Sequence, residues 1–222
     1  MIRGVLGSLL VLALAAAPAS AQVKFEASVL GGYTFSEGVK GDPHFLPLLG
    51  GTFDSIDVKS GGFFGLTFGV VLDNGGEVGF TYGRQMSSLS LSNNGANENK
   101  IGDMSIDSYH GYFAYNFLAD SKVRPYVSIG FGATDYGTVP VTGGTISGPV
   151  RFSANLGAGV KAWANDHIGF RAGFTYTPTY ITTDPEGWWC DPYWGGCWLV
   201  GDHKYSNQFN MSGGVVFRFG GS

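Results

Sequence analysis

The stretch from Val150 to Trp163, VRFSANLGAGVKAW, alternates apolar residues with polar or small ones along its whole length. A period of two is the geometry of a β-strand with one oily face and one polar face. A helix would scatter the same apolar residues around its axis, so the pattern excludes a helix. The stretch is longer than an ordinary strand of about five or six residues. When tilted, it is long enough to cross a bilayer.

A single strand of this kind would leave unpaired backbone groups in lipid, so a membrane-spanning strand requires enough others to close a barrel. Seven more stretches alternate in the same way: residues 23–35, 64–72, 78–84, 108–117, 127–134, 168–176 and 210–219.

The connections between these eight strands alternate between long and short. Short turns lie near Asp73, Asp120 and Asp166, and long loops occupy residues 36–60, 87–103, 135–149 and 181–204. An even number of strands with short turns at one end and long loops at the other is typical of transmembrane barrels. The sequence therefore predicts an all-β fold, an eight-stranded antiparallel up-and-down transmembrane β-barrel.

The polar phase of the strands decides which face points outward. A small soluble barrel filled with these polar residues would have no core. In a membrane barrel they face inward, because Arg or Lys on the lipid face at mid-depth costs about 2–4 kcal/mol. The charges predicted to line the interior are Lys24, Glu26, Arg151, Lys161, Arg171 and Arg218.

The chain begins MIRGVLGSLLVLALAAAPASAQ, with one basic residue, a short apolar run and the small tripeptide Ala19-Ser20-Ala21. This order is typical of a secretory signal peptide, and the run is too short for a transmembrane helix. We expect residues 1–21 to be cleaved and residues 22–222 to form the barrel domain. Removing Arg3 leaves 12 basic residues against 17 acidic ones, a net charge of −5. No basic stripe suggests a nucleic-acid partner.

The last loop contains the only cysteines of the chain, Cys190 and Cys197. Export to an oxidising compartment favours a disulfide between them. A metal site that adds His203 and an aspartate is an alternative, although the spacing matches no standard zinc pattern. The loop is also rich in aromatic residues, which either stack on an external ligand or pack on one another over the barrel mouth: Trp188, Trp189, Tyr193, Trp194 and Trp198.

Several short phrases resemble the outer-membrane β-barrel family that includes the OmpA-type and OmpW-type small barrels. They are Arg124-Pro125-Tyr126-Val127 with Gly130 and Gly132; Gly157, Gly159, Lys161 and Trp163 with Asn165-Asp166-His167, Gly169 and Arg171; and the closing stretch from Gly213 to Phe219. The chain departs from the family pattern because Gly220, Gly221 and Ser222 follow the last aromatic residue. The resemblance implies the outer membrane of a Gram-negative-type envelope, with its lipid, lipopolysaccharide and barrel-assembly machinery as partners.

Two roles are compatible with such a barrel: a structural or surface-contact role without enzymatic activity, or a narrow passive channel of the OmpW type. Inward glycines that leave volume inside keep the channel open as an alternative: Gly65, Gly79, Gly130, Gly157, Gly159 and Gly173. Ser108 and His110 share the inward face, and Glu26 across the barrel would complete a hydrolytic triad. Lipid A hydrolases of this shape, however, use a His-x-Ser pair that faces lipid. We expect no enzyme and no cofactor.

Overall fold

The computed structural model describes residues 24–46, 51–93, 96–141, 144–181 and 205–220. In this part of the chain no helix has the length and apolar character that a membrane span requires. The secondary structure described is twelve β-strands: β1 (Lys24–Ser36), β2 (Val39–Leu46), β3 (Gly51–Val58), β4 (Gly61–Val71), β5 (Gly76–Asn93), β6 (Ala96–Asn116), β7 (Val123–Asp135), β8 (Thr138–Val141), β9 (Gly144–Ser147), β10 (Val150–Trp163), β11 (Ile168–Tyr180) and β12 (Tyr205–Phe219).

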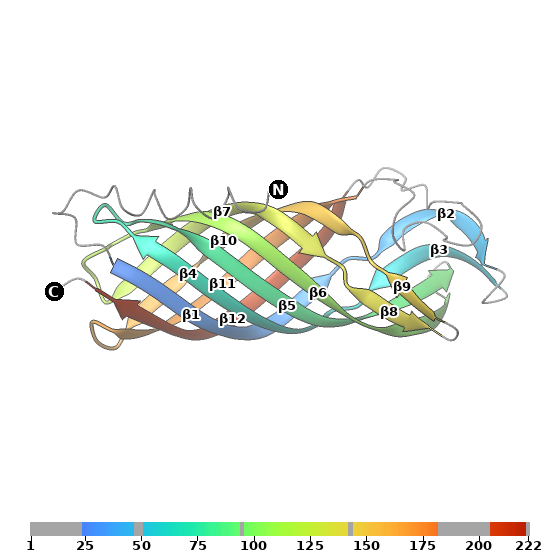
Figure 1. The fold of residues 1–222 in the computed structure, drawn as a ribbon, viewed down its shortest axis with the longest axis horizontal. Coiled ribbons are helices and arrows are strands. Elements are labelled where there is room, and N and C mark those ends of the chain that lie inside the picture. The colour runs from blue at the N-terminus through green and yellow to red at the C-terminus, as the bar shows by residue number, and fades with distance from the viewer. Residues whose placement is uncertain (1–23, 47–50, 94–95, 142–143, 182–204, 221–222) are drawn as a thin grey trace, which may run out of the picture.

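Eight of these strands close into a barrel (Figure 1). Each pairs antiparallel with its neighbours in the ring β1, β4, β5, β6, β7, β10, β11, β12, and β12 returns to β1. The closing pair is in continuous register from Phe25 opposite Phe219 to Ser36 opposite Gln208. The predicted all-β, eight-stranded antiparallel barrel is confirmed.

Tight turns connect the strands at one end, which we call the short-turn end. Between β4 and β5 the chain reverses at Gly75, whose φ of 86° is readily adopted only by glycine. Asn74 Oδ1 accepts a hydrogen bond from the Gly76 amide and fixes this turn. Between β10 and β11, Asn165 Oδ1 accepts bonds from the amides of His167 and Ile168. These are the turns predicted from Asp73 and Asp166.

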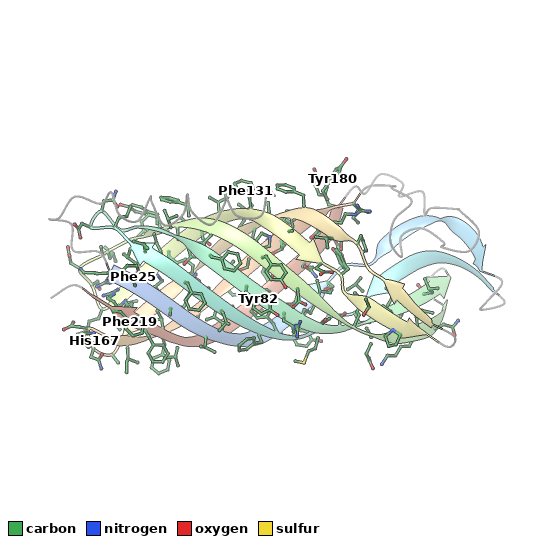
Figure 2. All side chains as sticks on the ribbon, in the orientation of Figure 1. Phe25, Tyr82, Phe131, His167, Tyr180 and Phe219 are labelled. Atoms are coloured by element: carbon green, nitrogen blue, oxygen red, sulfur yellow. The ribbon has the colours of Figure 1, made fainter. Side chains whose placement is uncertain are left out.

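The outer surface of the barrel is apolar, as the alternation predicts. Large side chains on it remain exposed in the isolated chain, including Phe68, Phe131, Phe152 and Phe170, each more than half exposed. A soluble protein rarely exposes so continuous an apolar surface, so this face is the one that meets lipid. Figure 2 shows Phe131 on this surface, Phe25, His167 and Phe219 at the short-turn end, and Tyr180 toward the other end.

The long loops contain more strand than predicted. Within residues 87–103, expected to be a polar loop, residues 87–93 continue β5 and residues 96–103 belong to β6, well past the barrel. The signal is present in Ser-Ser-Leu-Ser-Leu-Ser over 87–92, which alternates with a period of two despite its serines. Likewise, residues 36–60 contain β2 and β3, and residues 135–149 contain β8 and β9, which pair with each other.

These extensions, with the adjoining ends of the barrel strands, bury apolar side chains at the long-loop end of the barrel. The β8–β9 hairpin lies tightly against β6. Val139 Cγ1 of β8 is 2.7 Å from the place where a side chain at Gly102 of β6 would have its Cβ, so the two would clash. Tyr136 and Val139 are completely buried. The other apolar side chains buried in this region are Val58, Leu89, Leu91, Met104, Ile106 and Ile181.

Candidate functional site

An ion-pair network crosses the interior of the barrel near the short-turn end. Lys161 Nζ lies 2.6 Å from Glu26 Oε2 and 2.5 Å from Glu77 Oε2, so one ammonium group serves two carboxylates. Arg218 Nη2 lies 2.7 Å from the other oxygen of Glu26. All three contacts are buried, since Lys161, Glu26 and Glu77 are at most 4% exposed. Burial at this level is tolerated only because the charges pair.

Neutral groups add hydrogen bonds to Glu77 and Arg171. Tyr112 donates its hydroxyl to Glu77 Oε1 at 2.6 Å, and Asn116 Nδ2 donates to Glu77 Oε2 at 3.0 Å. Arg171 donates Nε to the Tyr126 hydroxyl at 3.1 Å and Nη1 to the hydroxyl of a threonine on β4, Thr67, at 3.3 Å. The network is therefore hydrogen-bonded at each charged centre, which is the condition for a stable buried cluster.

Strand register places these residues together. Glu26 of β1 lies directly opposite Arg218 of β12, so their ion pair crosses the seam at which the barrel closes. Lys161 and Arg171 are also directly opposite each other, and two like charges there would repel. Glu77 and the ring of Tyr126 offset this repulsion, with the Arg171 guanidinium 4.5 Å from the ring centroid.

Every strand of the barrel contributes to this cluster. Its members are Glu26 on β1, Thr67 on β4, Glu77 on β5, Tyr112 and Asn116 on β6, Tyr126 on β7, Lys161 on β10, Arg171 on β11 and Arg218 on β12. We call this set the interior network. The interior network connects all eight strands across the lumen.

Aromatic rings occupy the volume that the inward glycines leave. The Tyr126 hydroxyl lies 2.7 Å from the place where Gly159 would carry a Cβ and 2.6 Å from that of Gly173. The Phe63 ring likewise comes within 2.8 Å of the Cβ position of Gly65. At Gly65, Gly159 and Gly173, three of the six inward glycines, part of the expected interior volume is therefore occupied by aromatic side chains. Tyr112 over Gly69 and Gly79, and Phe63 over Gly83, follow the same rule.

One small cavity lies in the interior of the described barrel. This cavity of about 30 Å³ lies on the long-loop side, lined by residues that include Thr34, Phe63, Gln85 and Asn210. Such a volume has room for on the order of one or two water molecules. Gln85 Oε1 accepts a hydrogen bond from Gln208 Nε2 at 3.1 Å, and Asn210 Nδ2 donates to Thr34 Oγ1 at 2.9 Å, so side chains also bridge the strands here.

The three residues considered for a hydrolytic triad have other partners. His110 Nε2 lies 2.8 Å from Ser153 Oγ, and Ser153 in turn is bonded to Thr134. Ser108 donates to a backbone carbonyl, that of Gly83. Glu26 is bonded to Lys161 and Arg218. His110 and Ser153 are both buried, at 2% and 0% exposure, so substrate could not reach this pair without opening the barrel.

The remaining predicted interior charges, Lys24 and Arg151, lie outside the interior network. Both are half-buried, near the two ends of the barrel. Glu77, which the sequence reasoning missed, follows the turn glycines Gly75 and Gly76 and is in phase with the inward residues of β5. That phase is the signal that could have found it. Cys190, Cys197 and His203, with the aromatic residues around them, lie outside the described residues.

The fold resembles that of several solved bacterial barrels. The outer membrane protein OprG of Pseudomonas aeruginosa matches with a TM-score of 0.62 and 12% identity, over 90% of this chain and 97% of that one. Neisserial surface protein A matches with a TM-score of 0.53 and 16% identity, over 89% and 97% of the two chains. The N-terminal barrel domain of P. aeruginosa OprF matches with a TM-score of 0.50 and 15% identity, over 90% and 100%.

At these identities the three structures show a shared fold. They do not show what this chain does. A comparison with curated proteins finds no match. The model of a family described as "Outer membrane protein beta-barrel domain" matches residues 7–219, nearly the whole chain. The chain therefore belongs to this family of outer-membrane β-barrels, and its location is the outer membrane of a Gram-negative envelope.

Proposed function

We propose that this protein is a non-conducting, non-enzymatic outer-membrane barrel that acts in envelope structure and surface contacts. The observation that carries this proposal is the interior network, which fills the lumen with ion pairs and aromatic rings contributed by all eight strands. An eight-stranded barrel has an interior just wide enough for side chains to fill. A solute would have to break several buried, paired charges to pass.

The surface-contact part of the proposal rests on the strands beyond the barrel. Long loops of outer-membrane barrels face the exterior, so the extensions of β5 and β6, with β2, β3, β8 and β9, lie outside the cell. Their buried core around Tyr136 and Val139 gives this region a defined shape. These strands are not needed to close the barrel. An ordered sheet of this kind can hold a contact surface in place outside the membrane.

Four further features belong to this proposal. We propose that residues 1–21 are a cleaved signal peptide and that the assembly machinery of the outer membrane inserts the mature chain. We also propose a disulfide between Cys190 and Cys197, and an external ligand at the Trp-rich loop around them. Thiol reagents should label neither cysteine in the intact protein without reductant; free labelling of both would remove the disulfide from the proposal.

Single-channel recording of the refolded full chain in planar bilayers tests the non-conducting role. We expect no reproducible openings, because the interior network blocks the lumen. The same bilayers, given a conducting porin afterwards, show that the assay detects channels. Reproducible openings of the barrel would contradict this role and favour the narrow passive channel instead.

A further inference from the structure

Along the outer face of β5 and β6, the type of side chain changes in a regular order with distance from the short-turn end. On β5 the outward residues run from Val78 and Phe80 through Tyr82 to Arg84, and then to Met86 and Ser88. On β6, which pairs with β5, the corresponding outward residues are Phe113, Tyr109, Asp107, Ser105 and Asp103. Both strands therefore present apolar side chains, then tyrosines, then a charged pair, and then a mixed level of two serines, one methionine and one aspartate.

The charged pair is held in one orientation. Arg84 donates Nε to Asp107 Oδ1 at 2.7 Å and Nη2 to Asp107 Oδ2 at 2.8 Å, which is a bidentate contact. Tyr82 donates its hydroxyl to the same carboxylate at 2.8 Å. The Arg84 side chain is 51% exposed, whereas that of Asp107 is 11% exposed. Within the described chain, Arg84 Nη1 makes no hydrogen bond, so a fixed guanidinium edge faces outward.

A broad depression of about 560 Å³ lies next to this pair, on the side farther from the lipid-facing rings. Hydroxyl groups dominate its lining, with one exposed methionine and one carboxylate. Donors and acceptors of this density suit a polyhydroxylated ligand, and the Met86 side chain offers an apolar contact for the face of a sugar ring. The lining includes Ser60, Met86, Ser88, Asp103, Ser105 and Thr138.

We propose that this face of β5 and β6 binds the phosphorylated sugar headgroup of an outer-leaflet glycolipid. The order of the side chains matches the order of such a lipid: acyl chains against Phe80 and Phe113, a phosphate against Arg84, and sugar hydroxyls in the depression. Arginine forms strong, directional bonds to phosphate, and at this height a guanidinium edge is adjacent to the headgroups. Tyr82 and Tyr109 mark the interface, with ring centroids 5.3 Å apart.

This inference goes beyond the proposed function and is independent of whether the lumen conducts. It rests on the outer-membrane location and on the external face of the barrel, and no residue of the interior network takes part. A conducting barrel would leave it intact, and a failure of lipid binding would leave the non-conducting role intact.

Native mass spectrometry of the refolded full chain in detergent micelles tests the site. The probes are diphosphoryl lipid A, its dephosphorylated form, and phosphatidylglycerol, which carries a phosphate without the sugar. We expect diphosphoryl lipid A to bind about tenfold more tightly than either of the others, a ratio equivalent to about 1.4 kcal/mol. Arg84→Gln should lose about tenfold in affinity for diphosphoryl lipid A, the scale of one charge-assisted hydrogen bond. Ser88→Leu, which places bulk in the depression, should also weaken binding.

Two further variants keep the result interpretable. Arg84→Gln combined with Asp107→Asn leaves no unpaired carboxylate, and it should fold like the wild type and show the same loss. Lys122→Gln removes an exposed cation at the short-turn end and should bind like the wild type. Equal affinities for diphosphoryl and dephosphorylated lipid A would overturn the site. So would an Arg84→Gln affinity within about twofold of the wild type, or an equal loss in Lys122→Gln.

Discussion

Replacing Lys161 with methionine is expected to destabilise the folded barrel by about 3–5 kcal/mol, the usual cost of breaking a buried ion pair by removing one partner. The lumen of a transmembrane barrel generally tolerates exchange, but Lys161 is an exception because it pairs with two buried carboxylates. Glu26 would keep Arg218 as its partner. Glu77 would lose the ion pair that it makes here and keep only neutral donors.

Urea unfolding of the barrel in lipid vesicles, followed by the heat-modifiable band on gels, measures this loss. Combining Lys161→Met with Glu77→Gln should recover most of the lost stability, since it removes the stranded carboxylate. Lys122→Met is the matched control, because Lys122 lies exposed in the turn between β6 and β7. If Lys161→Met unfolds within about 1 kcal/mol of Lys122→Met, the network contributes no more than a surface charge does.

Leu156→Arg is expected to cost about 2–4 kcal/mol, because it places a charge on the lipid face near the bilayer midplane. Leu156 lies near the middle of β10, is 49% exposed on the outer surface, and is flanked by Tyr176 and Ile129 on the adjacent strands. Val150→Arg provides a control on the same face of the same strand. Val150 lies at the strand end, where the cost falls to about 0–1 kcal/mol.

The same unfolding assay compares the two arginine variants. A large loss of unfolding free energy for Leu156→Arg, with a small loss for Val150→Arg, would show that Leu156 lies near the bilayer midplane and Val150 near its edge. Equal losses would mean that β10 does not cross the bilayer in the way its alternation indicates.

The alternation of side chains made most of the fold predictable. In β10 each residue's phase predicted which face it occupies, because a strand has a period of two whatever its partners are. In residues 87–92 the serine-rich composition predicted a loop, whereas the alternation of serine and leucine is that of a strand. The extensions of β5 and β6 were missed for this reason.

The interior network was predictable only in part. Phase placed Glu26, Lys161, Arg171 and Arg218 on the polar face, but not which of them would meet. Contacts across a lumen depend on the tilt and stagger of all the strands, which no single strand encodes. The pairing of Glu77 with Lys161 joins β5 to β10 across the barrel in this way. The aromatic rings over inward glycines depend on the same stagger.

The central claim, a lumen filled by side chains, is tested most directly by the reactivity of a thiol placed inside it. Thr67 is inward-facing on β4, 5% exposed and bonded to Arg171, and cysteine is close to it in size. In a background of Cys190→Ser and Cys197→Ser, the Thr67→Cys protein is exposed to a small hydrophilic thiol reagent in its folded and heat-unfolded forms. We predict that the folded barrel labels only through rare local opening, far more slowly than the unfolded chain. Equal labelling rates in the two forms would contradict a filled lumen.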